Sequence, residues 1–299
     1  MKIDVIKNKK ISFGISGLII LIGIIMMITF GLNFGIDFTG GTLIQIDLGK
    51  EVPVSELREI MDNFDDNASI VHAGEGNEEV IIKSTTDYNN EERIEIFNEY
   101  KEAYSLEEDA LINQQKFGAN IGEETRNKAL ISVLIATVGM LIYITYRFEF
   151  NFGIAAIVAL MHDVLIGLSV YSIFRISVNS SFIAAMLIIV GYSINDTIVV
   201  FDRIRENIKK TRKQPFEDII NHSIKQTITR SINTSVTTLI AVTLLYILGV
   251  EAIKDFALPL IIGILSGTYS SLFIASPVWY LLKRRKEKVN MYNPNTVDN

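Results

Sequence analysis

Long apolar runs separated by charged segments dominate this chain of 299 residues. A helix that crosses a bilayer needs about 20 mostly apolar residues, because the hydrocarbon core is roughly 30 Å thick. The first apolar run follows Lys7, Lys9 and Lys10 and could be a signal peptide, but it is long and has no small-x-small cleavage pattern, so we interpret it as a retained anchor. The pattern predicts six transmembrane helices at residues 11–31, 129–146, 152–173, 181–201, 233–249 and 257–282.

The segment from 32 to 126 differs from the apolar runs because it is charged and its hydrophobic period changes. Alternating and β-rich stretches predict four strands, and helical spacing predicts two helices between them. The order β-α-β-β-α-β predicts a small ferredoxin-like domain, so the fold class is an α-helical polytopic membrane protein with one α+β domain. The predicted strands are 42–47, 69–72, 80–83 and 110–116, and the predicted helices are 54–64 and 94–104.

The distribution of charge predicts the orientation of the chain. Basic residues in short loops stay on the cytoplasmic side of a membrane. They cluster in the amino terminus (1–10), in the 202–230 loop and in the tail (283–299), so we expect both termini to be cytoplasmic and the α+β domain to be extracytoplasmic. That domain is rich in Asp and Glu, which argues against nucleic acid as its partner.

Polar residues inside apolar spans are the candidates for function, because a membrane-embedded charge is costly and is a functional hypothesis by default. We expect these residues to line one buried seam between the third, fourth and fifth helices, where carboxylates could relay protons. The alternative is that they only hydrogen-bond the helices together, and this alternative weighs most for the Asn and Thr residues. The seam residues are His162, Asp163, Asn195, Asp196, Arg230, Asn233, Thr234 and Thr237.

Other features predict packing and exclude several kinds of chemistry. Gly263 and Gly267 form a GxxxG pattern that allows close helix approach. Asp37 alone would be a turn aspartate, and Gly118 to Glu124 would be a hinge or a turn. The chain has no cysteine, no P-loop and no GxSxG or HExxH pattern, and adjacent His162 and Asp163 should point to different faces. We therefore expect no enzyme activity, no metal site and no cofactor.

Three stretches resemble signatures of the SecD/SecF family, which belongs to the resistance-nodulation-division superfamily. Gly35 to Gly41 (GIDFTGG), which includes Asp37, Gly40 and Gly41, resembles the motif that follows the first helix. Val190 to Asn207, which includes Gly191, Asp202 and Arg203, resembles the fourth-helix signature of the half that pairs with SecD, and Thr229 to Leu239 resembles its fifth-helix signature.

The resemblance implies a role in protein export. The family's pair uses a proton gradient, or a sodium gradient in some members, to move its outer domains. The partners implied are a separate SecD chain, the SecYEG translocon, unfolded polypeptide in transit and the lipid bilayer. By motif position, the ion-pathway aspartate of the family falls on Asp196 and its partner arginine on Arg230. The alternatives are a half-size exporter of small molecules or lipids and a scaffold of the translocon that transports nothing.

Overall fold

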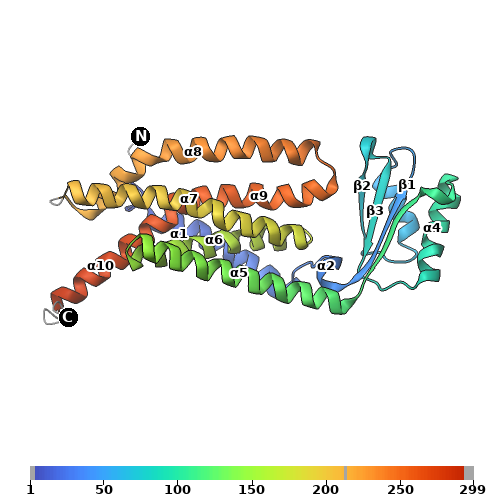
Figure 1. Cartoon of the computed structure of the whole chain (residues 1–299), viewed down its shortest axis with the longest axis horizontal. Coiled ribbons are helices and arrows are strands. Elements are labelled where there is room, and N and C mark those ends of the chain that lie inside the picture. The colour runs from blue at the N-terminus through green and yellow to red at the C-terminus, as the bar shows by residue number, and fades with distance from the viewer. Residues whose placement is uncertain (1–3, 212–213, 293–299) are drawn as a thin grey trace.

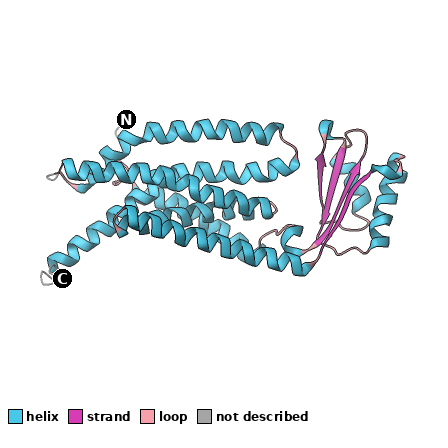
Figure 2. Cartoon of the chain, in the orientation of Figure 1, coloured by secondary structure: helices cyan, strands magenta, loops and turns pink. Residues whose placement is uncertain are grey.

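The computed structural model describes residues 4–211 and 214–292. A bundle of long helices forms one part of the molecule, and a compact αβ unit sits at one end of the bundle (Figure 1). Residues 1–3, 212–213 and 293–299, which belong to the predicted cytoplasmic segments, lie outside the described residues. Six helices are long and apolar enough to cross a membrane, and Figure 2 separates them clearly from the sheet.

The bundle helices extend beyond the apolar runs. The segment 202–230 is expected from its amphipathic pattern to continue the fourth helix, to break at Gln214 and Pro215 and to restart as a helix along the cytoplasmic surface. The structure has this break, since α7 continues to Lys210 and α8 begins at Phe216, but α8 then continues into the fifth span. The first turns of α8 pack inside the bundle, with Ile220 and Ile224 fully buried, so they do not lie flat on the membrane surface. The helices are α1 (Lys9–Phe30), α5 (Ala119–Arg147), α6 (Phe150–Ile173), α7 (Ser180–Lys210), α8 (Phe216–Leu248), α9 (Glu251–Ser270) and α10 (Ser276–Tyr292).

The sixth predicted span consists of α9 and α10 joined through one π-helical stretch, Ser271–Ala275. This stretch is almost entirely buried. π-helical turns inside α-helices are rare and occur often at functional sites. Here the turn shifts the register between α9 and α10 next to the polar centre of the bundle.

The αβ unit has the predicted ferredoxin-like order. Its four strands form an antiparallel sheet in the order β2-β3-β1-β4, and its two main helices cover one face over a core that includes Leu57, Ile82 and Tyr100. The capping box of α4, formed by Asn89 and Glu92, fixes where that helix begins. The elements are α2 (Ile36–Thr39), β1 (Gly41–Asp47), α3 (Val54–Met61), β2 (Ser69–Ala73), β3 (Glu79–Ser84), α4 (Asn90–Tyr104) and β4 (Leu111–Phe117).

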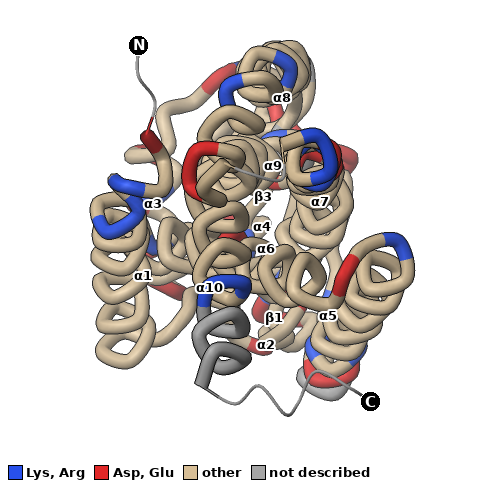
Figure 3. The backbone as a smooth tube through the Cα atoms, turned by 90° about the vertical axis from the view of Figure 1, so that its left-hand side faces the viewer, with Lys and Arg blue, Asp and Glu red and all other residues tan. Residues whose placement is uncertain are grey.

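The two ends of the bundle differ. The αβ unit covers one end, and the first and last described residues, Asp4 and Tyr292, belong to segments that reach the other end (Figure 1). Lys and Arg residues gather at the end with the termini, with some acidic residues among them (Figure 3). Below them, a hydrophobic core is centred on Trp279, whose ring stacks on Phe152 with centroids 4.6 Å apart.

Candidate functional site

Asp196 lies in the buried face of α7, toward the end with the termini. Its side chain is 4% exposed, and among the described residues its Oδ2 atom has no hydrogen-bond partner. The groups that act on it come from α8, where Ser235 is the polar neighbour and Arg230 carries the opposite charge. Buried polar atoms are nearly always paired, so an unpaired carboxylate oxygen calls for a functional explanation.

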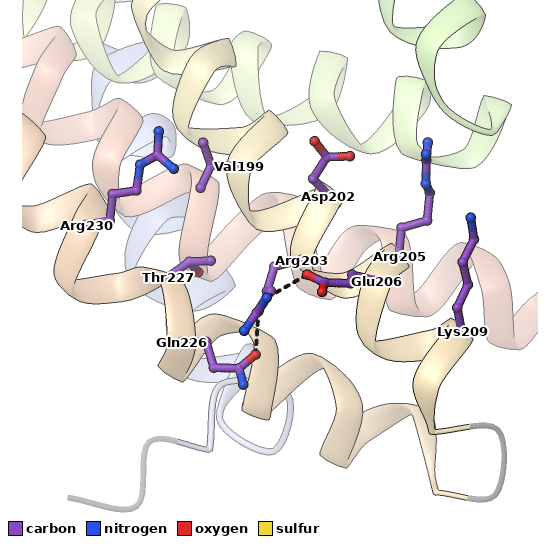
Figure 4. A pocket seen from close by; sticks show the side chains of 9 residues that line it. All are labelled: Val199, Asp202, Arg203, Arg205, Glu206, Lys209, Gln226, Thr227 and Arg230. Atoms are coloured by element: carbon purple, nitrogen blue, oxygen red, sulfur yellow. Dashed lines mark hydrogen bonds and ion pairs between the residues drawn. The ribbon is translucent and has the colours of Figure 1, made fainter.

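Arg230 connects this buried carboxylate to a charged cavity of about 530 Å³ between α7 and α8. Arg230 and Val199 lie at one end of the cavity and Lys209 at the other, while Arg203 is held by Gln226 and Glu206 at 2.6 Å each (Figure 4). Arg230 is exposed, and among the described residues its side chain donates no hydrogen bond and forms no ion pair within 4.0 Å. Its charge nevertheless acts on Asp196 from α8. The lining residues are Val199, Asp202, Arg203, Arg205, Glu206, Lys209, Gln226, Thr227 and Arg230.

Asp163 forms a second buried polar site, on α6. Its Oδ1 accepts from Ser266 at 2.7 Å and lies 3.1 Å from His162 Nδ1. Its Oδ2 accepts from Ser193 at 2.6 Å and from Ser270 at 2.9 Å. Both carboxylate oxygens are thus occupied by donors from α6, α7 and α9, so this aspartate ties three helices together.

His162 extends the Asp163 site to α1. Its Nε2 lies 2.9 Å from the Ser16 hydroxyl, and its ring stacks on Tyr269 with centroids 6.0 Å apart. His162 reaches α1 while Asp163 reaches α7 and α9, so the two side chains serve different faces of α6, although His162 Nδ1 also lies 3.1 Å from Asp163 Oδ1. No cluster of three or more His, Cys, Asp or Glu that could hold a metal occurs in the described part of the chain.

The single seam predicted from the sequence was wrong in its membership. Asn195, Arg230, Asn233 and Thr237 are exposed rather than buried in a seam, and of these Arg230 lines the charged cavity. The hydroxyls of Thr234 and Thr237 donate to backbone carbonyls of their own helix, at 3.0 and 2.8 Å. The rotation of α8 instead buries two serines one turn apart, Ser231 and Ser235, and Ser235 lies 2.5 Å from Thr268 of α9.

Two serine pairs have a role that the sequence interpretation missed, since Ser266 and Ser270 beside the GxxxG glycines indicated only close packing. Ser266 and Ser270 of α9 are four residues apart, as are Ser231 and Ser235 of α8, so each pair lies on one face of its helix. In an apolar span such pairs provide interhelical hydrogen bonds. Serine is common on all faces of membrane helices, and for this reason the pairs did not stand out.

The predicted packing glycines lie against α7. A Cβ atom on Gly263 would overlap the Ile189 side chain, and one on Gly267 would stand 2.9 Å from Ser193 Cβ. Close approach of α7 and α9 therefore brings Ser193 and Ser270 to the same carboxylate. Gly191 of the fourth-helix motif has open space around it, and Asp202 lies 3.9 Å from Arg147 of α5.

The motif with Asp37 joins the αβ unit to the start of α7. Asp37 Oδ2 accepts from the Ser180 backbone N–H at 2.8 Å, so this carboxylate sits at the amino end of α7 rather than in an isolated turn. Gly40 and Gly41 adopt positive φ angles of 77° and 138°, which favour glycine. The predicted hinge is the first turn of α5, where a Cβ on Gly122 would stand 2.6 Å from the Phe38 carbonyl oxygen.

Asp255 makes a second link between the αβ unit and the bundle, which the sequence did not indicate. Its Oδ2 accepts from Asn179 at 2.8 Å and lies 3.5 Å from Lys83 of β3. Asn179 in turn caps α7 by accepting from Phe182 N–H at 2.9 Å. The helix that carries Asp196 thus begins at contacts shared with the αβ unit.

Comparison with known proteins agrees with the motifs. A family model described as "Protein export membrane protein SecD/SecF, C-terminal" matches residues 98–285, and one described as "SecD/SecF GG Motif" matches residues 25–52. The protein translocase subunit SecF of Calditerrivibrio nitroreducens is 41% identical, over 96% of this chain and 96% of that protein. The SecF of Thermodesulfovibrio yellowstonii is 40% identical, over 94% of both chains.

Proteins in which SecD and SecF are fused match this chain over only part of their own length. A crystal structure of SecDF, a translocon-associated membrane protein from Thermus thermophilus, superposes with a TM-score of 0.83 at 35% identity. The match covers 95% of this chain and 39% of that one. This multi-pass membrane chain therefore belongs to the SecD/SecF family of protein export membrane proteins.

Proposed function

We propose that this chain is a protein translocase subunit that assists Sec-dependent protein export across the cytoplasmic membrane. The proposal is supported by similarity over nearly the full length of relatives that carry this name. The chain corresponds to 39% of the fused SecDF it resembles, so the proposed partner is a separate SecD chain. The complex would act beside the SecYEG translocon on unfolded polypeptide, with both termini of this chain in the cytoplasm and its αβ unit outside.

The proposed driving force is an ion gradient, and Asp196 with Arg230 is the proposed site where the ion binds and is released. The observation that carries this proposal is the unpartnered Oδ2 of Asp196 beside a free arginine. A proton bound at that oxygen would neutralise the carboxylate and weaken its attraction for Arg230, which would let α8 move relative to α7. Protons are the proposed ion, with sodium as the alternative.

The start of α7 would transmit this movement. Contacts of Asp37 with Ser180, and of Asp255 with Asn179 and Lys83, lie where α7 meets the αβ unit. A shift of α7 along its axis, or a rotation about it, would therefore change the contacts that hold the αβ unit against the bundle. The proposal assigns the chain no catalytic step and no cofactor.

The test is a pulse-chase of a secreted precursor in cells whose only copy of this gene carries Asp196→Asn. We expect the precursor to mature as slowly as in cells that lack the gene, while SecD still co-purifies with the variant. Asp218→Asn is a matched control, because Asp218 is exposed in the first turn of α8 and does not line the charged cavity, and it should leave the chase unchanged. Normal maturation with Asp196→Asn would reject ion coupling and leave a scaffold role. Normal maturation in cells that lack the gene would reject the export role itself.

A further inference from the structure

A largely apolar cavity of about 440 Å³ opens between α5, α6 and α7, apart from both buried aspartates. Its walls are almost entirely hydrocarbon. It lies in the half of the bundle nearer the αβ unit, since the α5 residues that line it run from Arg126 to Thr137 at the end of the helix that leaves the sheet. Its walls include Phe34, Ala129, Val133, Val164, Phe182 and Met186.

The length of the cavity matches one leaflet of a bilayer. The lining stretch of α5 from Arg126 to Thr137 is 11 residue steps, or about 16 Å at 1.5 Å per residue. Half of a hydrocarbon core is about 15 Å thick. A chain that starts at the headgroup level beside Arg126 would therefore end near the midplane, at the inner end of the cavity.

Among the described residues, Arg126 is the only charged one that lines this cavity. Its side chain is exposed, and within the described part of the chain it has no hydrogen-bond or ion-pair partner. It is one turn beyond Gly122, which packs against the motif next to the αβ unit, so it stands at the rim rather than in the apolar interior. An arginine in this position is matched to the phosphate of a lipid whose chain enters the cavity.

The charge at the rim favours a lipid over a helix of a partner protein. A transmembrane helix would cover the apolar walls but brings no phosphate to Arg126, whereas a phospholipid supplies both the chain and the anion. A soluble anion alone would leave the apolar walls in contact with water, which is unfavourable. A single alkyl chain matches both the length of the cavity and its apolar lining.

We propose that this cavity binds one acyl chain of a phospholipid from the leaflet that faces the αβ unit, with the lipid phosphate on Arg126. The site is independent of the ion coupling proposed above. Because β4 passes directly into α5 at Gly118, a chain held between α5 and the α6–α7 wall would set the position of the helix that supports the αβ unit. The bound lipid would act as a spacer at the base of that unit.

The test uses the full-length chain, alone and co-purified with SecD, in phosphatidylcholine vesicles that contain a phosphatidylglycerol with a photoactivatable group in the middle of one chain. After irradiation, the labelled peptides are mapped by mass spectrometry. We expect the label on α5 and α7 residues that line the cavity. Ala129→Trp or Val164→Phe, which fill it from opposite walls, should lower this label about tenfold, because several methylene groups lose their contacts.

Matched variants separate the chain from the headgroup. Ile135→Trp places the same bulk on an exposed face of α5 outside the cavity and should leave the label unchanged. Arg126→Gln should remove the preference for phosphatidylglycerol over a photoactivatable phosphatidylcholine. Competition by soluble glycerol phosphate would mean that the headgroup alone is recognised and would overturn the acyl-chain site.

Three other results would reject the proposal. The first is label spread evenly around α5, and the second is label that persists in both filling variants. The third is label that disappears when SecD is present, which would mean that a partner covers this face. Retention of the folded state in the filling variants is checked by the elution volume and by co-purification with SecD.

Discussion

Two buried aspartates in the same bundle have opposite surroundings. Asp163 accepts or approaches four donors, which fill both of its oxygens. Asp196 is equally buried but has one oxygen without a partner among the described residues and faces a free Arg230. A buried charge with all its hydrogen bonds stabilises a structure, whereas one with an empty lone pair is prepared to bind something else. Burial alone therefore does not identify a functional acid.

The partners of the two carboxylates explain their different roles. Asp163 is surrounded by serines on α7 and α9 that are packed too closely to separate easily, because Gly267 lets the two helices meet. Asp196 faces α8. The side chain of Arg230 on α8 lines a charged cavity and is not packed against another helix. The first site holds helices together, and the second lies at the interface where we propose that α8 moves.

The largest expected effect on folding comes from Asp163→Ala. It leaves three serine hydroxyls and His162 without their acceptor, so the free energy of unfolding should fall by about 2 to 4 kcal/mol. The measurement is unfolding in mixed micelles, followed through the fluorescence of Trp279, the only tryptophan of the chain. An equal loss for Asp196→Ala would remove the distinction between the two sites.

A smaller effect is expected for Gly263→Leu, because the new side chain would overlap Ile189 and push α9 from α7. Overpacking of this kind should lower the free energy of unfolding by about 1 to 3 kcal/mol. Gly191→Leu is the matched control, since its site is open. A loss of equal size in the control would show that the effect comes from glycine itself and not from helix contact.

Asp37→Asn should have a modest effect, confined to the start of α7. It removes a negative charge from the amino end of a helix, which is worth about 0.3 to 1 kcal/mol. Hydrogen exchange of the Ser180 amide should speed up by a few-fold. Asp87→Asn, which removes an exposed ion pair with Lys116, should leave that amide unchanged. Unchanged exchange in Asp37→Asn would break the link between the motif and α7.

The smallest effect on folding is expected for Asp196→Asn. The variant removes a charge that lacks a full set of partners, so the free energy of unfolding should change by less than about 0.5 kcal/mol or rise slightly. Export should nevertheless slow in Asp196→Asn. In Asp163→Asn, by contrast, we expect any loss of export to come with a loss of stability. A strong destabilisation by Asp196→Asn, measured through Trp279 as above, would make this residue a structural one.

The sequence determined the architecture because architecture depends on length and period. Apolar runs long enough to cross a bilayer fixed the six spans, and the change to a period of two fixed the strands of the αβ unit. Single residues whose type is costly in a membrane, Asp196 and Asp163, were also identified in this way. The amphipathic pattern also predicted a helix at 216–228, but its sequence did not show that the bundle, rather than the membrane surface, would cover its apolar face.

Only the tertiary structure decided which polar residues meet. The faces of α8 depend on how the helix is rotated about its axis, and this rotation is set by packing against α7 and α9 rather than by the polarity of α8 alone. Asn233 and Thr237 therefore face outward, while Ser231 and Ser235 face inward. The same packing brought Ser266 and Ser270 to Asp163 and left Asp196 with a free oxygen. Contacts between helices far apart in the chain carry no local pattern, because each depends on the positions of several backbones at once.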